Sequence, residues 1–377
     1  MAGKGQGHIQ SAPVISAAAP LFRARAIGFD PGFKEWLELR RKRVEEYPRR
    51  EQAYVPVKEK YDAEMKRWWN EVHNSPEYTA RVKAWEEENK QAVEAGKPPL
   101  PRPQPPEPRP VAPESPDGGR DLPYMIGNFY HAMVAPLIPY AIRGVTWYQG
   151  ESNSDNAKQY RALFPILIAD WREKWGQGDF PFLFVQLPNL GKPATEPVQN
   201  QDNWVGTREA QARALALPNT GMAVTIDVGD PYEVHVKDKR DVGVRLSLVA
   251  RHIVYGEDLV YTGPSYDSMT IEEKRIRITF NNVGSGLKIG SPPWTPSSKI
   301  PPLAAEVKGV AIAGADKKWY WANTRIEGNT LVVWSSQVSA PMAVRYGWAN
   351  NPLCNLYNKE NLPAAPFRTF RTDTWEP

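Results

Sequence analysis

Two segments of the chain carry apolar residues at helical spacing. In residues 155–175 the large apolar side chains recur every three or four positions, and Gly176 follows as a C-terminal stop. A second stripe of this kind runs from Val242 to Ile253 and ends at Gly256. Both patterns predict amphipathic helices with one buried face.

Short continuous apolar runs alternate with these helices. They cover Gly144–Tyr148, Phe182–Leu187 and Met222–Val228. Their length and their content of aromatic and β-branched residues are typical of buried strands. The alternation of such strands with helices predicts an α/β fold, with a parallel sheet and helices on its faces.

The last third of the chain has a different pattern, without helical periodicity. Short strand-like runs are separated there by Gly, Asn, Pro and Ser, and they cover Ile276–Phe280, Val307–Ala313, Leu331–Trp334 and Ala343–Trp348. We expect an antiparallel β-rich portion that packs on the α/β part.

A highly charged region precedes the predicted sheet. Apolar positions between Tyr61 and Val72 follow a helical spacing, and a second charged helix is predicted near Tyr78–Ala95. We expect Pro48 and Pro56 to break any single long helix. The basic run at 40–43 could suit nucleic acid, but nearby glutamates neutralise it, which favours a solvated helix face.

Residues Pro98–Pro116 contain ten prolines in nineteen positions. This composition predicts an extended, polyproline-like stiff spacer, with a role as an SH3-type ligand as the alternative. The expected organisation is an irregular segment, a charged helical insertion, a Pro-rich linker, an α/β hydrolase part and a β-rich portion, at residues 1–32, 33–97, 98–122, 123–265 and 266–377.

Composition excludes several classes of function. The net charge is only +4, which gives no reason to expect nucleic acid or an anionic membrane as partner. Cys354 is the single cysteine, so a disulfide framework and a multi-thiolate zinc site are excluded. The five histidines form no metal-ligand pair, and no metal is expected. No run of about 18 apolar residues predicts a membrane span.

The first candidate for chemistry is WYQGESN at residues 147–153, directly after a predicted strand. Functional groups collect at the carboxyl ends of strands in open α/β sheets. Gln149 offers an amide N–H and Gly150 allows close approach of the backbone, and both suit an oxyanion hole. The alternative is a polar turn before a helix, with Ser152, Ser154 or Asp155 as its N-cap.

The second candidate is DVGDPYEVH at residues 227–235, after another predicted strand. His235 on such a loop, with Asp230 and Glu233 nearby, suits a general base whose imidazole is oriented by a carboxylate. The alternative is an ordinary surface histidine. We expect His252 to be structural, because it lies in a predicted helix, and His131 is ambiguous.

With these two blocks the chain resembles the sialate O-acetylesterase family of SGNH-type carbohydrate esterases, from about Tyr124 to Thr372. The segments that carry the resemblance include MVAPLIPYAIRGVTWYQGESN, YRALFPILIADWREKWGQGDFPFLFVQLPN, REAQARALALPNTGMAVTIDVGD and AVRYGWANNPLCNLYN. The resemblance implies an SGNH-like parallel sheet and removal of acetyl groups from O-acetylated sugars, sialic acid above all. It implies a Ser nucleophile and no cofactor.

The resemblance also implies roles for individual residues. Gln149, Gly150 and Glu151 correspond to the oxyanion and substrate-binding block, and His235 corresponds to the catalytic base. Glu233 stands where the family usually has an acidic residue that orients this histidine. The resemblance further implies a secreted or periplasmic location, although the N-terminus is not a good signal peptide.

The sequence departs from the family pattern at the motif that carries the catalytic nucleophile. The family's nucleophile lies in a GQSN-type motif after its first strand, and the sequence contains no such motif. Ser11, in GQGHIQS, is not preceded by a strand, so the nucleophile is unknown. We therefore expect the C-terminal part of a longer enzyme, or a chain completed by a separate polypeptide that carries the motif. The alternatives are a non-catalytic carbohydrate-binding or assembly remnant and a related acetyl-xylan esterase.

Overall fold

The computed structural model describes residues 31–95, 98–113, 129–197, 204–290 and 306–370. The chain divides into two compact units, one at Asp30–Asn128 and one formed by the rest of the chain. We call them the helical unit and the sheet unit, and each is described by itself. The finer boundaries expected from the sequence stay predictions.

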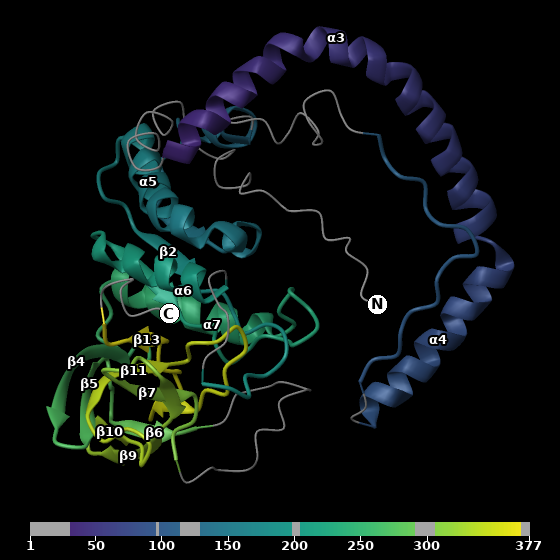
Figure 1. Ribbon diagram of the computed structural model, residues 1–377. Helices are drawn as coiled ribbons and strands as arrows, with labels where there is room; N and C mark the ends of the chain where they lie inside the picture. Colours follow the sequence, from purple (N-terminus) through teal and green to yellow (C-terminus); the bar gives the residue numbers. More distant parts are fainter. Residues whose placement is uncertain (1–30, 96–97, 114–128, 198–203, 291–305, 371–377) are drawn as a thin grey trace. The chain divides into compact units, whose positions relative to one another are not determined.

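The helical unit begins with one long helix, α3 (Pro31–Arg67). A short π-helix, Trp68–His73, connects it to α4 (Pro76–Glu94). The helix predicted near Tyr78–Ala95 is thus confirmed. The expectation that Pro48 and Pro56 end a helix is wrong, because both lie inside α3. Each proline removes one backbone hydrogen bond and favours a bend, and around them α3 is largely exposed, where water can satisfy the freed carbonyls. Figure 1 shows α3 as one curved helix.

The Pro-rich segment 98–113 contains neither helix nor strand, as predicted. It is not a free spacer, however, because it runs back along α4 in the opposite direction (Figure 1). The Tyr78 hydroxyl donates to the carbonyl of Pro103 at 3.1 Å, and Trp85 Nε1 donates to the carbonyl of Leu100 at 3.2 Å. Proline has no N–H, so side-chain donors from the helix take the place of a backbone ladder.

The later part of the Pro-rich segment, at Glu107, is bound to the start of the short π-helix Trp68–His73. Trp68, which is buried, donates from Nε1 to the carbonyl of Glu107 at 3.0 Å, and Arg67 forms an ion pair with the Glu107 carboxylate at 2.8 Å. The segment is therefore an integral part of the helical unit. The SH3-type alternative stays a prediction.

The sheet unit contains a three-stranded parallel sheet in the order β1-β2-β3, which confirms the predicted α/β arrangement. The strands are β1 (Val145–Trp147), β2 (Phe182–Val185) and β3 (Thr220–Ala223). β2 is buried throughout, whereas β1 is only half-buried because it lies at an edge. The third strand was predicted too far along the chain, since residues 224–228 are buried but leave the sheet.

Helices cover both faces of this sheet. α5 (Ala157–Trp175) packs on one face, where Phe164 contacts Phe184 edge-on at 5.0 Å between ring centroids. α7 (Lys239–Ile253) packs on the other face, against β2 and β3. A Cβ on Gly221 would lie 2.3 Å from Val249 of α7, so glycine is required for this close packing. Both helices were predicted from their apolar stripes.

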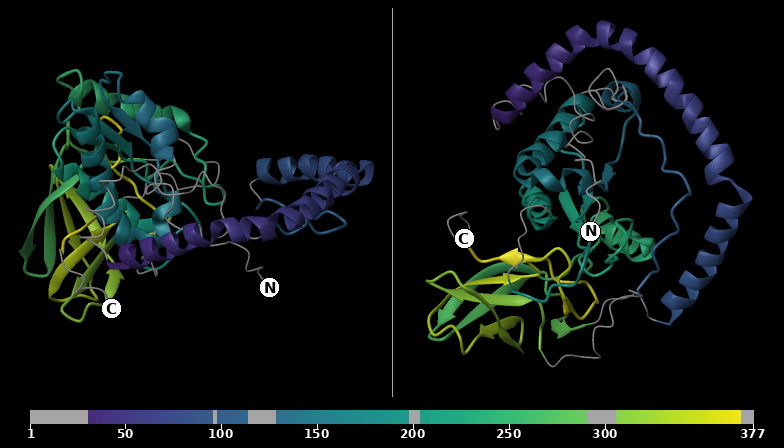
Figure 2. Two further views of the ribbon diagram at one scale, coloured as in Figure 1. Left: turned by 90° about the horizontal axis from the view of Figure 1, so that it is seen from above. Right: turned by 45° about the vertical axis from the view of Figure 1, so that its right-hand side comes forward.

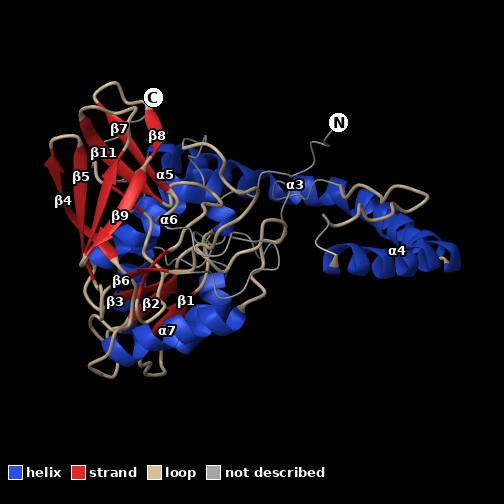
Figure 3. Ribbon diagram, turned by 90° about the horizontal axis from the view of Figure 1, so that it is seen from below, coloured by secondary structure: helices blue, strands red, loops and turns tan. Residues whose placement is uncertain are grey.

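The β-rich portion is antiparallel, as predicted, and forms a separate layer of the sheet unit (Figures 2 and 3). One sheet contains β4 (Ser265–Glu272), β5 (Arg275–Asn281), β10 (Thr330–Trp334) and β9 (Asn323–Glu327). The second contains β13 (Phe367–Arg368), β11 (Pro341–Tyr346), β7 (Val310–Gly314) and β8 (Trp319–Trp321). A two-stranded sheet pairs β12 (Leu356–Asn358) with β6 (Leu287–Ile289).

Candidate active site

The loops that follow β2 and β3 are in direct contact at the carboxyl end of the sheet. Thr225 donates from its hydroxyl to the carbonyl of Gln186, and the N–H of Gly229 donates to Asn189 Oδ1 at 2.7 Å. A Cβ on Gly229 would lie 1.9 Å from the carbonyl oxygen of Asn189. Only glycine therefore allows the two loops to approach this closely.

Gln211, on α6 (Trp204–Arg213), joins the loop after β1 to β2. Its amide nitrogen donates to the carbonyls of Gln149 and Val185, at 3.1 and 3.2 Å. Its amide oxygen accepts from the N–H of Leu187 at 2.8 Å. Gln211 is fully buried, so this single side chain holds the two strand ends in register. Sequence reasoning missed it because its partners lie 24 to 62 residues away.

Gln149 is held from both sides of its amide group. The Gln149 amide nitrogen donates to Asn153 Oδ1 at 2.6 Å. The Tyr160 hydroxyl lies 3.4 Å from the side-chain Oε1 of Gln149 and 3.2 Å from its backbone carbonyl, as a donor to these oxygens. Gly150 next to it is buried, and a Cβ there would lie 3.1 Å from the amide nitrogen of Gln211. The block is thus a fixed structure whose Gln149 amide nitrogen retains a second N–H for a ligand.

The alternative interpretation, a polar turn before a helix, is right about the turn, but none of Ser152, Ser154 and Asp155 is the N-cap. Residues Glu151–Asn156 form a 3₁₀ turn, η5, and the N-cap of α5 is Asn156, whose side chain makes no capping hydrogen bond. Glu151 opens this turn, and its carbonyl accepts from the Ser154 hydroxyl at 2.8 Å. Ser154 therefore closes the turn on itself instead of capping α5.

His235 and Glu233 form a contact pair on the loop that follows β3. Glu233 Oε1 lies 2.9 Å from His235 Nδ1 and accepts from the His235 backbone N–H at 3.0 Å. These hydrogen bonds lower the pKa of Glu233. The imidazole is 86% exposed, so its other nitrogen faces solvent. A carboxylate at Nδ1 is the arrangement that orients a histidine as a general base.

Asp230 has other partners. Its carboxylate accepts from the N–H of Tyr232 at 2.8 Å and pairs with Lys237 at 3.2 Å. Of the two candidate carboxylates, the structure therefore brings Glu233 to His235 and uses Asp230 to shape the loop.

A contact between Lys239 and Tyr148 brings the His235 loop and the Gln149 loop together. Lys239, at the start of α7, has its ammonium nitrogen 5.1 Å from the centroid of the Tyr148 ring. Burial and the nearby Glu151 raise the pKa of Tyr148 to about 12, so its hydroxyl is neutral at physiological pH. Tyr148, which precedes Gln149, thus lies beside the start of α7, which directly follows the His235 loop.

A buried ion pair anchors the base of the His235 loop. Asp227 accepts two hydrogen bonds from Arg245 of α7, at 2.5 and 2.8 Å, and a third from the Tyr357 hydroxyl of β12 at 2.8 Å. Arg245 also donates to the carbonyl of Val224 at 2.8 Å. Arg245 lies on the apolar stripe of α7 beside Val242, and a charge in that position was an available signal for a buried ion pair.

Arg208 clamps the loop after β2 to the β-rich portion. Its guanidinium donates to the carbonyls of Leu187, Pro188, Ala349 and Asn350, at 2.6 to 2.8 Å. The side chain is fully buried, and burial lowers the pKa of Arg208 to about 9. Four carbonyls in place of a carboxylate make this group a structural clamp.

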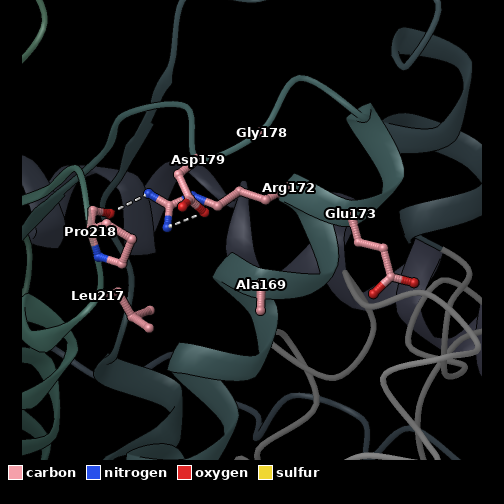
Figure 4. Close-up of a pocket in the computed structure, with 7 residues that line it drawn as sticks. All are labelled: Ala169, Arg172, Glu173, Gly178, Asp179, Leu217 and Pro218. Atoms are coloured by element: carbon pink, nitrogen blue, oxygen red, sulfur yellow. Dashed lines mark hydrogen bonds and ion pairs between the residues drawn. The ribbon is translucent and has the colours of Figure 1, made fainter.

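The sheet unit also has a pocket of about 360 Å³, lined by Arg172, Asp179, Pro218 and their neighbours (Figure 4). Arg172 donates to the carbonyls of Phe180 and Pro218, which precede β2 and β3. The pocket therefore lies at the amino ends of the strands, opposite the candidate residues. Its arginine is occupied by backbone carbonyls, and we assign it no part in the site.

The remaining candidates lie away from these loops or have structural partners. His252 contacts the carbonyl of Glu257 through Nδ1 at 3.0 Å and stacks on Tyr261. Ser11 lies outside the described residues. Over the described ranges no cluster of three or more His, Cys, Asp or Glu side chains could hold a metal ion. In the same part of the chain, no helix is long and apolar enough to cross a membrane.

Comparison with known proteins shows which class of protein this chain resembles in sequence and in fold. Residues 118–250 match the family described as "Carbohydrate esterase, sialic acid-specific acetylesterase". The crystal structure of XAC1771, described as a novel carbohydrate acetylesterase from Xanthomonas citri, superposes with a TM-score of 0.59 at 40% identity. That match covers 68% of this chain and 56% of the other. In fold and in sequence the chain is therefore similar to carbohydrate esterases.

Several curated proteins with sequences similar to this chain are sialate O-acetylesterases. Sialate O-acetylesterase of Pongo abelii is 32% identical over 271 residues, and that of Homo sapiens is 30% identical over 269 residues. Each match covers 65% of this chain and 49% of the relative. The chain is thus similar to the sialate O-acetylesterase family. It spans about half the length of the curated relatives it matches.

Proposed function

We propose that this chain forms the base and oxyanion side of a carbohydrate O-acetylesterase, which hydrolyses acetyl esters on sugar hydroxyls. The observation that carries the proposal is the 2.9 Å contact between Glu233 and His235 Nδ1, on the sheet edge that also holds Gln149. Similarity to this family supports an acetylated sugar as substrate, and we propose O-acetylated sialic acid as that sugar.

The proposed chemistry follows from these positions. A serine attacks the acetyl carbonyl while the exposed nitrogen of His235 takes its proton. Glu233 holds the ring in one tautomer and stabilises the imidazolium that forms. The free N–H of Gln149 donates to the tetrahedral oxyanion, where one donor is worth about 3–4 kcal/mol of barrier. Water then cleaves the acetyl-enzyme with the same histidine as base.

The serine is the missing part of this scheme. The sequence lacks the family's nucleophile motif, and loss of such a nucleophile costs about a million-fold in turnover. The nucleophile of this scheme is therefore not assigned to a residue of this chain. The chain by itself should hydrolyse esters only weakly.

Acetate release from 4-nitrophenyl acetate tests the role of His235. The purified chain is compared with His235→Ala, and His131→Ala serves as the control because it removes another exposed histidine. Hydrolysis that is lost in the first variant and kept in the second supports the proposal. Equal rates in all three proteins would contradict it. A parallel assay with acetylated xylan decides between sialate and xylan as substrate.

A further inference from the structure

One segment of the β-rich portion, residues 349–357, contacts the loops that follow both β2 and β3. We call it the brace segment. Near its start, the carbonyls of Asn350 and Asn351 accept hydrogen bonds from the backbone N–H groups of Leu190 and Ala194, at 3.0 and 2.9 Å. The loop after β2 is therefore tied to the brace segment by its backbone.

Two buried asparagines extend this connection to the loop of His235. The N–H of Gly229, in that loop, donates to Asn189 Oδ1 at 2.7 Å, and Asn189 Nδ2 donates to Asn351 Oδ1 at 2.9 Å. Asn351 Nδ2 in turn donates to the carbonyl of Gly191 at 2.6 Å. A backbone N–H can only donate and a backbone carbonyl can only accept, so the two ends of this asparagine relay allow each amide a single orientation. The relay therefore fixes Gly229 relative to the brace segment.

The other end of the brace segment reaches the same loop at a second point. The Tyr357 hydroxyl donates to the Asp227 carboxylate at 2.8 Å, and Arg245 donates to the same carboxylate. The side chains of Tyr357, Asp227, Asn189 and Asn351 are all more than nine-tenths buried. Loss of any of these hydrogen bonds would leave a buried polar group without its partner, so the attachment is costly to open.

His235 lies between fixed points of its loop. Asp227 and Gly229 precede it, and α7 follows it from Lys239 onward. The imidazole is exposed, and its contact with Glu233 is local to the loop. The position of the proposed base relative to the oxyanion block therefore depends on where the loop is attached. A displacement of about 1 Å at a catalytic group can cost about a hundredfold in rate.

We propose that Asn351 and Tyr357 are positioning residues of the esterase site, through which the β-rich portion holds the loop of His235 in place for proton transfer. The inference rests on the proposed esterase function. Both side chains are buried and act through a partner, Asn351 through Asn189 and Tyr357 through Asp227. The β-rich portion then takes part in catalysis by fixing the base.

The test compares Asn351→Leu with the matched control Asn355→Leu. Asn355 is also buried in the brace segment, and its side chain bonds to the N–H of Lys308 at 2.7 Å and to the carbonyl of Glu306 at 3.1 Å. Neither partner belongs to the loop of His235. Each variant replaces an amide that makes two hydrogen bonds by an apolar side chain of similar size. A loss of stability alone should therefore affect both variants alike.

Amide exchange of a peptide covering residues 227–236, under native conditions, measures how often the loop opens. We expect Asn351→Leu to exchange about tenfold faster than Asn355→Leu, or more, because the relay is broken. Tyr357→Phe removes only a hydroxyl, and should speed the exchange about fivefold over the unaltered chain.

The second readout is the part of 4-nitrophenyl acetate hydrolysis that is lost in His235→Ala. Its kcat should fall about tenfold or more in Asn351→Leu at an unchanged KM, because the base is displaced while substrate binding is kept. The same kcat should change less than about twofold in Asn355→Leu. A merely structural role of Asn351 would not separate these two variants.

Equal exchange in Asn351→Leu and Asn355→Leu would overturn the inference. If circular dichroism shows that Asn351→Leu does not fold, Tyr357→Phe decides, and exchange as slow as that of the unaltered chain would overturn it. Faster exchange with an unchanged His235-dependent rate would also overturn it, because the loop would be held without being positioned for chemistry. Faster exchange with hydrolysis that does not depend on His235 would keep the attachment of the loop and contradict the esterase function.

Discussion

In both the helical unit and the sheet unit, side chains donate hydrogen bonds to backbone carbonyls that lie outside helices and strands. In the helical unit, Trp85 donates to a carbonyl of the Pro-rich segment in an exposed hydrogen bond. In the sheet unit, fully buried side chains such as Arg208 and Gln211 donate to the carbonyls of strand-end loops. A donor lost at the surface can be replaced by water, whereas a donor lost in the interior leaves an unsatisfied group. The difference predicts that equivalent substitutions will have very different costs in the two units.

The largest effect should come from breaking the buried ion pair of the sheet unit. Asp227→Ala leaves the buried Arg245 with the more distant Asp241 carboxylate, at 3.9 Å, and the Val224 carbonyl, which should lower the free energy of unfolding by about 3 kcal/mol. Tyr357→Phe removes one hydrogen bond and should cost about 1 kcal/mol. A urea titration, monitored by amide exchange of peptides from the sheet unit, measures the free energy of unfolding of both variants. Asp258→Ala serves as the control because Asp258 is exposed. If Asp227→Ala and Asp258→Ala lowered the free energy of unfolding by similar amounts, the ion pair would not stabilise the sheet unit.

Two glycines of the sheet unit should respond in opposite directions to the same substitution. Gly229→Ala places a Cβ 1.9 Å from the carbonyl oxygen of Asn189, so the loops must separate, at a cost of about 1–3 kcal/mol. Gly243→Ala lies inside α7 with open space around the new Cβ, and should stabilise by up to about 1 kcal/mol. Thermal unfolding of both variants measures the difference. A neutral Gly229→Ala would show that the two loops do not need this contact.

In the helical unit the cost of losing a carbonyl donor should be small. Trp85→Phe removes the N–H that bonds to Leu100 but keeps an aromatic ring, and should cost about 0.5–1 kcal/mol. Trp69→Phe is the control, since Trp69 is exposed, whereas Trp85 is half-buried, and no carbonyl partner is found for the Trp69 N–H within the described ranges. Amide exchange of α4 peptides in urea measures both variants. A Trp85→Phe effect as large as that of Asp227→Ala would invalidate the comparison between the units.

The smallest effect concerns pH. Hydrogen bonds from His235 lower the pKa of Glu233 in the folded protein. The contribution of this contact is therefore fully present above the usual glutamate pKa of about 4.3 and is lost as the pH falls through the lower folded value. NMR titration of the Glu233 side-chain carboxyl should give a midpoint below 4.3. The same titration in His235→Ala should move the midpoint back toward 4.3, and an unchanged midpoint would show that the contact does not form.

Local patterns predicted the elements that depend on neighbouring residues. The stripes of α5 and α7, the αL conformation of Gly176 and the main antiparallel strands all follow from spacing over a few residues. Pro48 and Pro56 were misjudged, because the rule against proline in a helix assumes that freed carbonyls cannot be hydrated. The end of β3 was also misjudged, since residues 224–228 are apolar for burial in a loop and not for a strand.

Sequence by itself determined the chemistry that this chain offers and the chemistry that it lacks. The pair Glu233 and His235 lies two residues apart, so its contact needs only a local turn, and the absence of the family's nucleophile motif is visible in the residues themselves. Tertiary structure alone decided which loops meet. The partners of Asp227 and Arg208 lie up to 130 and 142 residues away. Such contacts follow from burial and packing of distant segments, which no local pattern encodes.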